Sequence, residues 1–369
     1  MMNRRVYLLL GLSALAVVIS HACSRGLNAL IAWTHRYQSV IPLDYDPTKT
    51  FQFYFFVFII QIFVFGIAAF FFVSGFFISY SIDKKSGTIK WSTIKNRVLV
   101  ILIPYLIWTI FELISGVLIG ETETLSVMIQ RLVIGIPGFW FVPVLILFYL
   151  VSPWLIQLTK KGVTKFLIIS GLLQLVFIIL RYAWFGNIKI SFFHNILYDH
   201  FDETLLAYIF YFPLGIIVAT HLEQARLWLR KNIRIILVFT VTCFLVALLI
   251  NEGVHTYEFL KDKWAQCLLF ILTHCYDVGF ILLFLAPENI KIPFTTQLFK
   301  LSSRTYGIYL VHIWLMMYFT KFIYHVFPIL LSRQIIFTIL NILAGLGGSL
   351  LLMEGVKKYL KSSYTYLFG

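Results

Sequence analysis

His21 and Arg25 lie one helical turn apart near the end of the first long apolar run of the chain. Their i, i+4 spacing places both side chains on one face of a helix. An ionisable side chain is costly to keep inside a bilayer segment, which makes His21 a candidate functional residue. A neutral imidazole can accept a proton at physiological pH, as general-base chemistry requires. The alternative is that both residues lie at the membrane interface, where Arg25 extends its guanidinium into water.

A second group of candidates lies in and around the segment from Lys95 to Trp108. Lys95 and Arg97 precede the apolar residues of this segment, and such cations can bind the phosphates of a cytoplasmic donor. Pro104 is expected to kink the helix that follows. Glu112 lies deeper in the same apolar run and therefore needs either a polar partner or a neutral form.

Three further candidates come from short motifs in other apolar runs. Ser74, beside Gly75, makes a small notch in a phenylalanine-rich run, where another backbone or an acyl chain can approach closely. Ordinary packing of small residues between helices is the alternative for this notch. Trp140 opens another run, as interfacial aromatic anchors do. Tyr309 flanks His312 near the end of the chain.

Aromatic and polar residues are interleaved between Arg181 and Glu203. Such a segment suits a sugar ligand, through ring stacking and hydrogen bonds to hydroxyl groups, and it equally suits an ordinary hydrated loop. Its two histidines, His194 and His200, are not spaced as in common zinc sites. We therefore predict no metal site.

The composition requires a bilayer as the solvent of this 369-residue chain. Hydrophobic residues make up 60% and charged residues 12%, and the mean hydropathy is +0.89. Soluble domains carry about 25% charged residues. Apolar stretches of roughly 18 to 25 residues recur, each long enough to cross about 30 Å of hydrocarbon as a helix. About ten spans are predicted, the second of them long and bent: 6–30, 51–80, 97–120, 132–157, 164–184, 204–220, 233–251, 265–286, 302–326 and 333–354.

The net charge of +14 is distributed over alternate loops rather than concentrated in one patch. This is the positive-inside pattern of membrane proteins, and it excludes a nucleic-acid interface. One set of segments is basic: Arg4 and Arg5; Lys84, Lys85, Lys90, Lys95 and Arg97; Lys160, Lys161 and Lys165; Arg226, Arg230, Lys231 and Arg234; Lys291, Lys300 and Arg304; Lys357, Lys358 and Lys361. The other set is mixed or acidic: Asp44 and Asp46; Glu121 and Glu123; Asp199, Asp202 and Glu203; Glu252 and Glu258. We therefore expect an all-α bundle in the cell inner (cytoplasmic) membrane, with an even number of spans and both termini cytoplasmic.

Two other readings of the sequence concern its first run and its cysteines. Arg4 and Arg5 before an apolar run resemble a cleaved signal peptide, but cleavage would leave an odd number of spans and break the charge pattern.

No loop exceeds about 25 residues, so residues 1–369 are expected to form one integral-membrane domain. His274 and Asp277 are polar residues within a predicted span, where they either line a cavity or make interhelical hydrogen bonds. The cysteines follow no disulfide pattern and are interpreted as small buried hydrophobes: Cys23, Cys243, Cys267 and Cys275.

Six segments, taken in order, carry a resemblance to a known family: Leu12 to His21, Phe71 to Phe76, Arg97 to Tyr105, Trp140 with Phe141, Phe212 to Gly215, and Ser303 to His312. They resemble motifs of the acyltransferase 3 family. Leu12 to His21 resembles the first span with its essential histidine, Phe71 to Phe76 the Phe-Phe-x-x-Ser-Gly-Phe motif, and Arg97 to Tyr105 the Ile-Pro-Tyr third span. Trp140 with Phe141 resembles the Trp-Phe-Leu motif, Phe212 to Gly215 a later glycine motif, and Ser303 to His312 the Ser-x-x-x-Tyr-Leu-x-His signature. These motifs cover nearly the whole chain. The chain departs from the family at Leu10 and Val100, where members often carry basic residues.

The resemblance implies transfer of an acetyl or other short acyl group from acyl-CoA, typically acetyl-CoA, to a hydroxyl of an envelope glycan or lipid-linked sugar. His21 would be the general base, or would relay the acyl group, while Arg97 and Lys95 hold the phosphates of the donor. Acyl-CoA is a co-substrate here, and no bound cofactor is expected. The remaining candidates for acceptor binding or for support of the site are Arg25, Ser74, Glu112, Trp140, Tyr309 and His312.

Two other functions compete with the enzyme. The family includes members described as exporters of surface polysaccharide, so a transporter or flippase of a lipid-linked or polymeric glycan is the main alternative. Many transporters carry inverted repeats with broken helices, and this sequence has no internal repeat at a fixed period. The third reading is a structural membrane subunit without activity.

Overall fold

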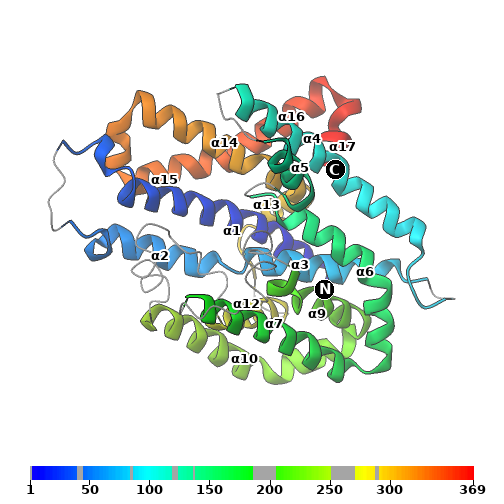
Figure 1. Cartoon of the computed structure of the whole chain (residues 1–369). Coiled ribbons are helices and arrows are strands. Elements are labelled where there is room, and N and C mark those ends of the chain that lie inside the picture. Colours follow the sequence, from blue (N-terminus) through cyan, green and yellow to red (C-terminus); the bar gives the residue numbers. More distant parts are fainter. Residues whose placement is uncertain are drawn as a thin grey trace. The chain divides into compact units, whose positions relative to one another are not determined.

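The computed structural model describes residues 2–39, 45–83, 86–118, 124–135, 138–185, 205–250, 271–286 and 291–369. Within these ranges the regular structure is helical, apart from an isolated antiparallel bridge between Ile82 and Ile89 (Figure 1). The predicted all-α fold is therefore confirmed. Most of the segment proposed to suit a sugar ligand, including His194 and His200, lies outside the described residues. Cys267 also lies outside them.

The ten predicted spans have counterparts among the described helices. Eight helical segments are long and apolar enough to cross a membrane: α1 (Met2–Ile31), α2–α3 (Phe51–Ser81), α4 (Trp91–Leu118), α6 (Phe141–Lys161), α7 (Val163–Phe185), α10 (Leu222–Ile250), α14 (Thr305–Val326) and α15–α16 (Gln334–Tyr359). Two shorter apolar helices, α9 (Tyr211–Thr220) and α12 (Ile271–Leu285), account for the other two. The side of the membrane on which the termini lie stays a prediction.

The outward faces of several helices are apolar, as a lipid solvent requires. On α7, large side chains about half exposed follow one another along the helix: Ile168, Ile169, Leu172, Leu173, Val176 and Ile179. A water-soluble helix would carry polar residues on such a face. The chain is thus a multi-pass membrane protein by the composition of its helices.

The structure interrupts the second predicted span, for which a bend was expected, and changes the start of the fourth. The long second run is interrupted at Val64 and Phe65, which separate α2 (Phe51–Phe63) from α3 (Gly66–Ile78). The fourth span was predicted at 132–157, and this start is wrong, because a separate helix α5 (Leu125–Ile134) precedes α6. Gly135 explains the break, since its φ of +105° cannot continue a right-handed helix.

The chain divides into two compact units. Unit 1 comprises Met1–Ile67 and Asn232–Tyr359, and unit 2 comprises Ala68–Lys231 and Leu360–Gly369. Each unit is built from segments far apart in the sequence.

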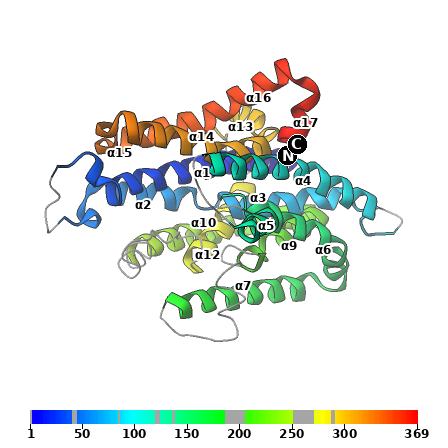
Figure 2. The same ribbon diagram turned by 45° about the horizontal axis from the view of Figure 1, so that its top comes forward.

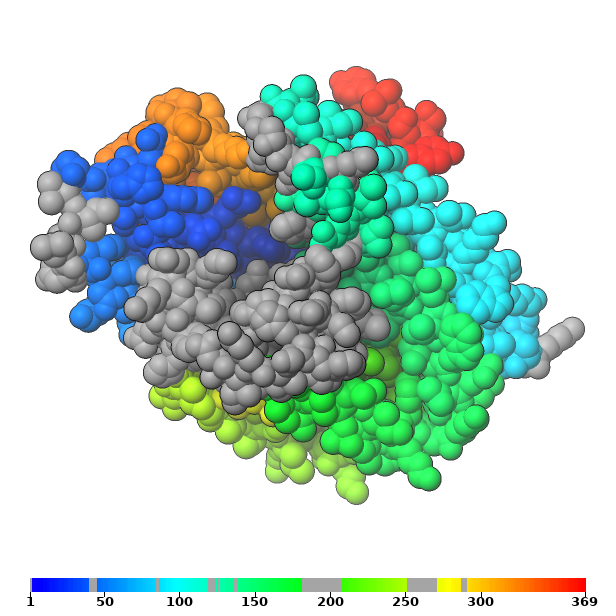
Figure 3. All heavy atoms as spheres, in the orientation of Figure 1, coloured from blue at the N-terminus to red at the C-terminus, as the bar shows by residue number. Residues whose placement is uncertain are grey.

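Unit 1 is organised around α1, which packs against α2, α12, α13 (Thr295–Ser302), α14 and α15 (Gln334–Ile342) (Figure 2). A Cβ atom at Gly11 would lie 2.0 Å from the carbonyl oxygen of Leu298, so only glycine permits the close approach of α1 and α13. The buried Arg5 donates from Nη1 to the carbonyl oxygen of Phe284 on α12 at 2.7 Å. In Figure 3 the atoms of α1, in blue, lie against the orange atoms of the α14 region.

A buried hydrogen bond joins α14 to α15, and a second one lies within α15. Thr320 donates from its hydroxyl to Oδ1 of Asn341 at 3.0 Å, and Nδ2 of Asn341 donates to the carbonyl oxygen of Phe337. Asn341 is fully buried, so these bonds satisfy its amide where water is excluded. A π-helical turn, Leu343–Gly347, then connects α15 to α16 (Gly348–Tyr359).

Unit 2 contains a helix pair as close as α1 and α13 in unit 1, α3 against α9. A Cβ atom built on Gly75 would lie 2.0 Å from the carbonyl oxygen of Phe212, and one on Gly215 would lie 2.0 Å from the carbonyl oxygen of Phe72. The two predicted motifs that contain these glycines therefore meet backbone to backbone. Small residues commonly allow such an approach in membranes, so the packing interpretation of the Gly75 notch is confirmed.

The end of the chain packs on α4 within the same unit. Trp108 on α4 donates from Nε1 to the carbonyl oxygen of Leu367 at 2.8 Å, and α17 (Tyr364–Phe368) lies along this helix. Pro104 lies inside α4, which continues through it.

Candidate active site

His21 and His312 meet in unit 1, on the neighbouring helices α1 and α14. Their ring centroids lie 5.4 Å apart with the ring planes tilted by 52°. His312 is fully buried, whereas His21 is only half-buried. An imidazole from the start of the chain is thus paired with one from near its end, which the sequence could not establish.

The hydrogen bonds of His312 define its tautomer. Its Nδ1 lies 2.9 Å from the carbonyl oxygen of Ile308 and 2.8 Å from that of Tyr309. Carbonyl oxygens only accept hydrogen bonds, so we assign the proton of the neutral ring to Nδ1. Nε2 then carries a lone pair, and it has no hydrogen-bond partner among the residues that the structure describes.

Arg25 brings a permanent positive charge to the two rings. It lies one turn beyond His21 on α1, donates from Nη2 to the carbonyl oxygen of Ile313 at 3.4 Å, and interacts electrostatically with His21 and His312. The buried Tyr309 places its ring centroid 6.1 Å from that of His312. Four of the predicted site residues therefore gather at one place.

This group can perform proton transfer next to a fixed cation. An imidazole with a free lone pair can accept a proton from a hydroxyl group, and a guanidinium can stabilise negative charge that develops on a carbonyl oxygen. No group of three His, Cys, Asp or Glu side chains that could hold a metal ion occurs in the described ranges. Activation of a hydroxyl group as a nucleophile is one reaction that these residues can support.

Arg97 belongs to a separate cluster in unit 2, at the end of α3 and the beginning of α4. Its Nη2 donates to the hydroxyl of Ser81 at 2.9 Å and lies 3.4 Å from the carbonyl oxygen of Phe77. The buried Tyr149 on α6 interacts with both Arg97 and Ser74. We refer to Ser74, Ser81, Arg97 and Tyr149 as the Arg97 cluster.

Tyr149 is a residue that the sequence analysis missed. It lies in the middle of an apolar run, and a single tyrosine in such a run gives little indication of a polar role. Ser74 and Arg97 were predicted for different roles, and Tyr149 brings them together. Lys95 is exposed and lies two residues before Arg97, so the two cations point away from each other on α4.

The structure places the remaining candidates of unit 2 outside the Arg97 cluster. Glu112 is half-buried further along α4. Trp140 precedes the first residue of α6 and stacks on Tyr208, with the centroids 5.7 Å apart. This stacking is a contact within the protein, so the role of Trp140 as an interfacial anchor stays a prediction.

The polar residues of α12 are buried in unit 1. His274 and Asp277 are 4% and 2% exposed, and their three-residue spacing places them on one face of the helix. Cys23 and Cys243 are buried free thiols and Cys275 is a half-buried one. Their environment agrees with the interpretation of these cysteines as small hydrophobes.

Comparison with known proteins assigns the chain to a protein family. The sequence pattern of the acyltransferase 3 family, described as an acyltransferase domain, matches residues 7–354. The chain is also similar to a protein of Staphylococcus aureus (strain MRSA252) named "Probable poly-beta-1,6-N-acetyl-D-glucosamine export protein", with 23% identity over 259 residues. That match covers 68% of this chain and 69% of the relative. No solved structure matches the chain.

Proposed function

We propose that this chain, which belongs to the acyltransferase 3 family, transfers an acetyl or other short acyl group from acyl-CoA to a hydroxyl of an envelope glycan. The observation that carries the proposal is the pairing of His21 with His312, 5.4 Å apart, beside Arg25. A proton acceptor next to a fixed cation is what attack of a hydroxyl on a thioester requires.

The reaction proceeds through a tetrahedral intermediate. The hydroxyl oxygen of the acceptor attacks the thioester carbonyl carbon, and His21 takes the hydroxyl proton. Arg25 stabilises the negative charge that develops on the carbonyl oxygen. The C–S bond then breaks, the ester C–O bond is complete, and His21 returns the proton to the sulfur of the leaving CoA. His312 supports the ring of His21, with its own proton held at Nδ1 by the two carbonyl groups.

The donor is held through its phosphate groups by cations on the cytoplasmic side, Arg97 first. The guanidinium of Arg97 is fixed by Ser81, by the carbonyl oxygen of Phe77 and by Tyr149. A guanidinium in a fixed orientation is well suited to bind phosphate oxygens in pairs. Acetyl-CoA is the donor that we expect.

The acceptor is a glycan on or in the envelope, and the protein resides in the cell inner (cytoplasmic) membrane with both termini in the cytoplasm. The alternate basic loops of the sequence support this orientation. The name of the Staphylococcus aureus relative refers to a poly-β-1,6-N-acetyl-D-glucosamine polymer, which supports a polysaccharide as the class of acceptor.

Replacement of His21 tests the proposal. Purified wild-type and His21→Ala proteins in lipid nanodiscs are incubated with radiolabelled acetyl-CoA and glycan extracted from the envelope. We expect His21→Ala to lower acyl transfer by roughly 100- to 10,000-fold, the usual contribution of a general base. His325→Ala, an exposed histidine at the end of α14, is the matched control and should keep wild-type activity. A folded His21→Ala protein with wild-type activity contradicts the role of His21.

Export of a glycan is the second candidate, favoured by the name of the relative. Inverted membrane vesicles distinguish the two functions. Labelled acetyl-CoA is added to the medium outside the vesicles, and fluorescent glycan is placed inside them in one experiment and outside in another. Transfer of the acetyl label to the glycan supports the enzyme. Movement of glycan across the membrane without transfer of label supports the exporter.

A further inference from the structure

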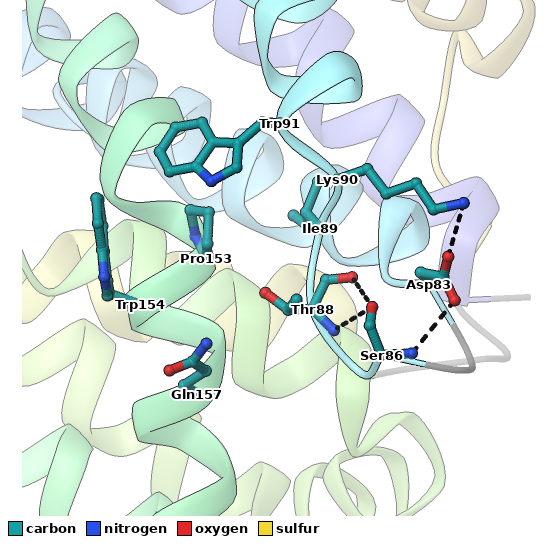
Figure 4. Close-up of a pocket in the computed structure, with 9 residues that line it drawn as sticks. All are labelled: Asp83, Ser86, Thr88, Ile89, Lys90, Trp91, Pro153, Trp154 and Gln157. Atoms are coloured by element: carbon teal, nitrogen blue, oxygen red, sulfur yellow. Dashed lines mark hydrogen bonds and ion pairs between the residues drawn. The ribbon is translucent and has the colours of Figure 1, made fainter.

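Unit 2 contains a cavity of about 410 Å³ that the Arg97 cluster does not use. Figure 4 shows that its walls come from two places: the short connection that leads into α4, and one face of α6. Ile89 and Trp91 lie on the first wall, and Pro153, Trp154 and Gln157 lie on the second. The two indole rings touch edge to face, with their centroids 5.6 Å apart. We call this space the tryptophan pocket.

The connection before α4 is held in one conformation. Asp83 accepts an ion pair from Lys90 at 2.9 Å, and its amide donates to the carbonyl oxygen of Thr88. Gly87 has a φ of +65°, a conformation that glycine adopts without strain, and its carbonyl oxygen accepts a hydrogen bond from Lys160 on α6. The wall opposite α6 is therefore preformed.

The pocket is aromatic at its centre and positively charged around it. Trp91 and Trp154 are each 55% exposed, so the protein leaves part of each indole ring uncovered. Lys95 is exposed one turn after Trp91 on the same face of α4. Lys161 is likewise exposed one turn after Gln157 on α6. A ligand that combines a flat ring with phosphate groups matches both features.

We infer that the tryptophan pocket binds the adenine ring and the ribose 3′-phosphate of the acyl-CoA donor. The inference rests on the proposed function, because acyl-CoA is the donor of that reaction. The purine ring stacks on Trp154, and Lys95 and Lys161 approach the phosphates. Lys95 was predicted to bind the donor together with Arg97, and the pocket gives it a role on its own face of α4.

The position of the pocket relative to the Arg97 cluster fits one extended donor. Pro153 lines the pocket, and Tyr149, which contacts Arg97, lies four residues earlier on α6. Four residues on a helix correspond to about 6 Å along one face. The nucleotide in the pocket would thus place its pyrophosphate near the guanidinium of Arg97.

Binding of adenosine 3′,5′-bisphosphate to the full-length protein in nanodiscs tests the inference without requiring acyl transfer. We expect Trp154→Ala to weaken this binding roughly tenfold, because stacking of a base on an aromatic side chain contributes on that scale. Trp154→Phe retains a ring and should stay within about threefold of wild type. Trp228→Ala is the matched control, since Trp228 is 53% exposed on α10 and does not line the pocket.

Kinetics with a shortened donor separate a direct role from a general loss of structure. Trp154→Ala should raise the KM for acetyl-CoA about tenfold and leave the KM for acetyl-pantetheine, which lacks the nucleotide, unchanged. Lys95→Glu is an exposed change that disturbs no packing and should also weaken binding of the bisphosphate.

Equal binding by wild type, Trp154→Ala and Lys95→Glu overturns the inference, even if acyl transfer from acetyl-CoA is observed. Binding that depends on Trp154 in a protein that transfers no acyl group supports the pocket and contradicts the proposed function. Quenching of tryptophan fluorescence by brominated phospholipid that is lost in Trp154→Phe and is not reversed by adenosine 3′,5′-bisphosphate assigns the pocket to lipid and also overturns the inference.

Discussion

Replacement of Gly75 by alanine gives the sharpest test of the packing in unit 2. The added methyl group would lie 2.0 Å from the carbonyl oxygen of Phe212, and ordinary contact begins at 3.4 Å. The atom that it meets belongs to the backbone of α9, so no side-chain rotation can relieve the clash. The two helices must separate by about 1.4 Å at this point.

The energetic cost follows from this displacement. Overpacking of a close contact costs about 1 to 3 kcal/mol, and we take the upper part of this range because backbone meets backbone. Alanine gains about 1 kcal/mol over glycine in helix propensity. The expected net destabilisation of Gly75→Ala is therefore about 1 to 2 kcal/mol.

Reversible unfolding in mixed micelles measures this cost. Gly171→Ala on α7 is the control within the same unit, because the nearest atom to its added methyl group lies at 3.7 Å, an ordinary contact. The control should be neutral or slightly stabilised. Equal unfolding free energies for the two variants would refute the close approach of α3 and α9.

Two further variants test individual hydrogen bonds. Thr320→Val leaves Oδ1 of the buried Asn341 without its donor and should lower the free energy of unfolding by about 1 kcal/mol. Adding Asn341→Leu to this variant should recover part of the loss. Strictly additive losses would contradict the coupling between Thr320 and Asn341. Tyr149→Phe removes the hydroxyl that contacts Ser74 and Arg97. It should raise the KM for acetyl-CoA about tenfold or more with kcat nearly unchanged, as loss of one hydrogen bond to a charged group suggests. A lower kcat at constant KM would exclude this role.

The spans were predictable because their signal is local. A helix that crosses a bilayer needs a continuous apolar run, and such runs are visible residue by residue. The exception is α5, since its ten residues are too few to span a membrane and its sequence continues into the next apolar run. Gly135 and Gly138, both with positive φ, lie between the two helices.

The composition of the site was only partly predictable. The spacing of His21 and Arg25 on one helix follows from helical geometry, and their shared face is confirmed by their common contact with α14. The pairing of His21 with His312 depends on how α1 packs against α14, which no local pattern encodes. The same reason explains why Tyr149 was missed, because its polar contacts lie on α3 and α4.

The packing of α1 against a late part of the chain has a consequence for biogenesis. Arg25 and Ile313, which meet across α1 and α14, are 288 residues apart in the sequence. At about 5 to 20 residues per second, synthesis of that interval takes roughly 15 to 60 s. During this time α1 holds a guanidinium and an imidazole in the membrane before their helical neighbour exists. We expect the insertion machinery to shelter α1 until α14 arrives, and a ribosome that stops early to leave a product that quality-control proteases recognise.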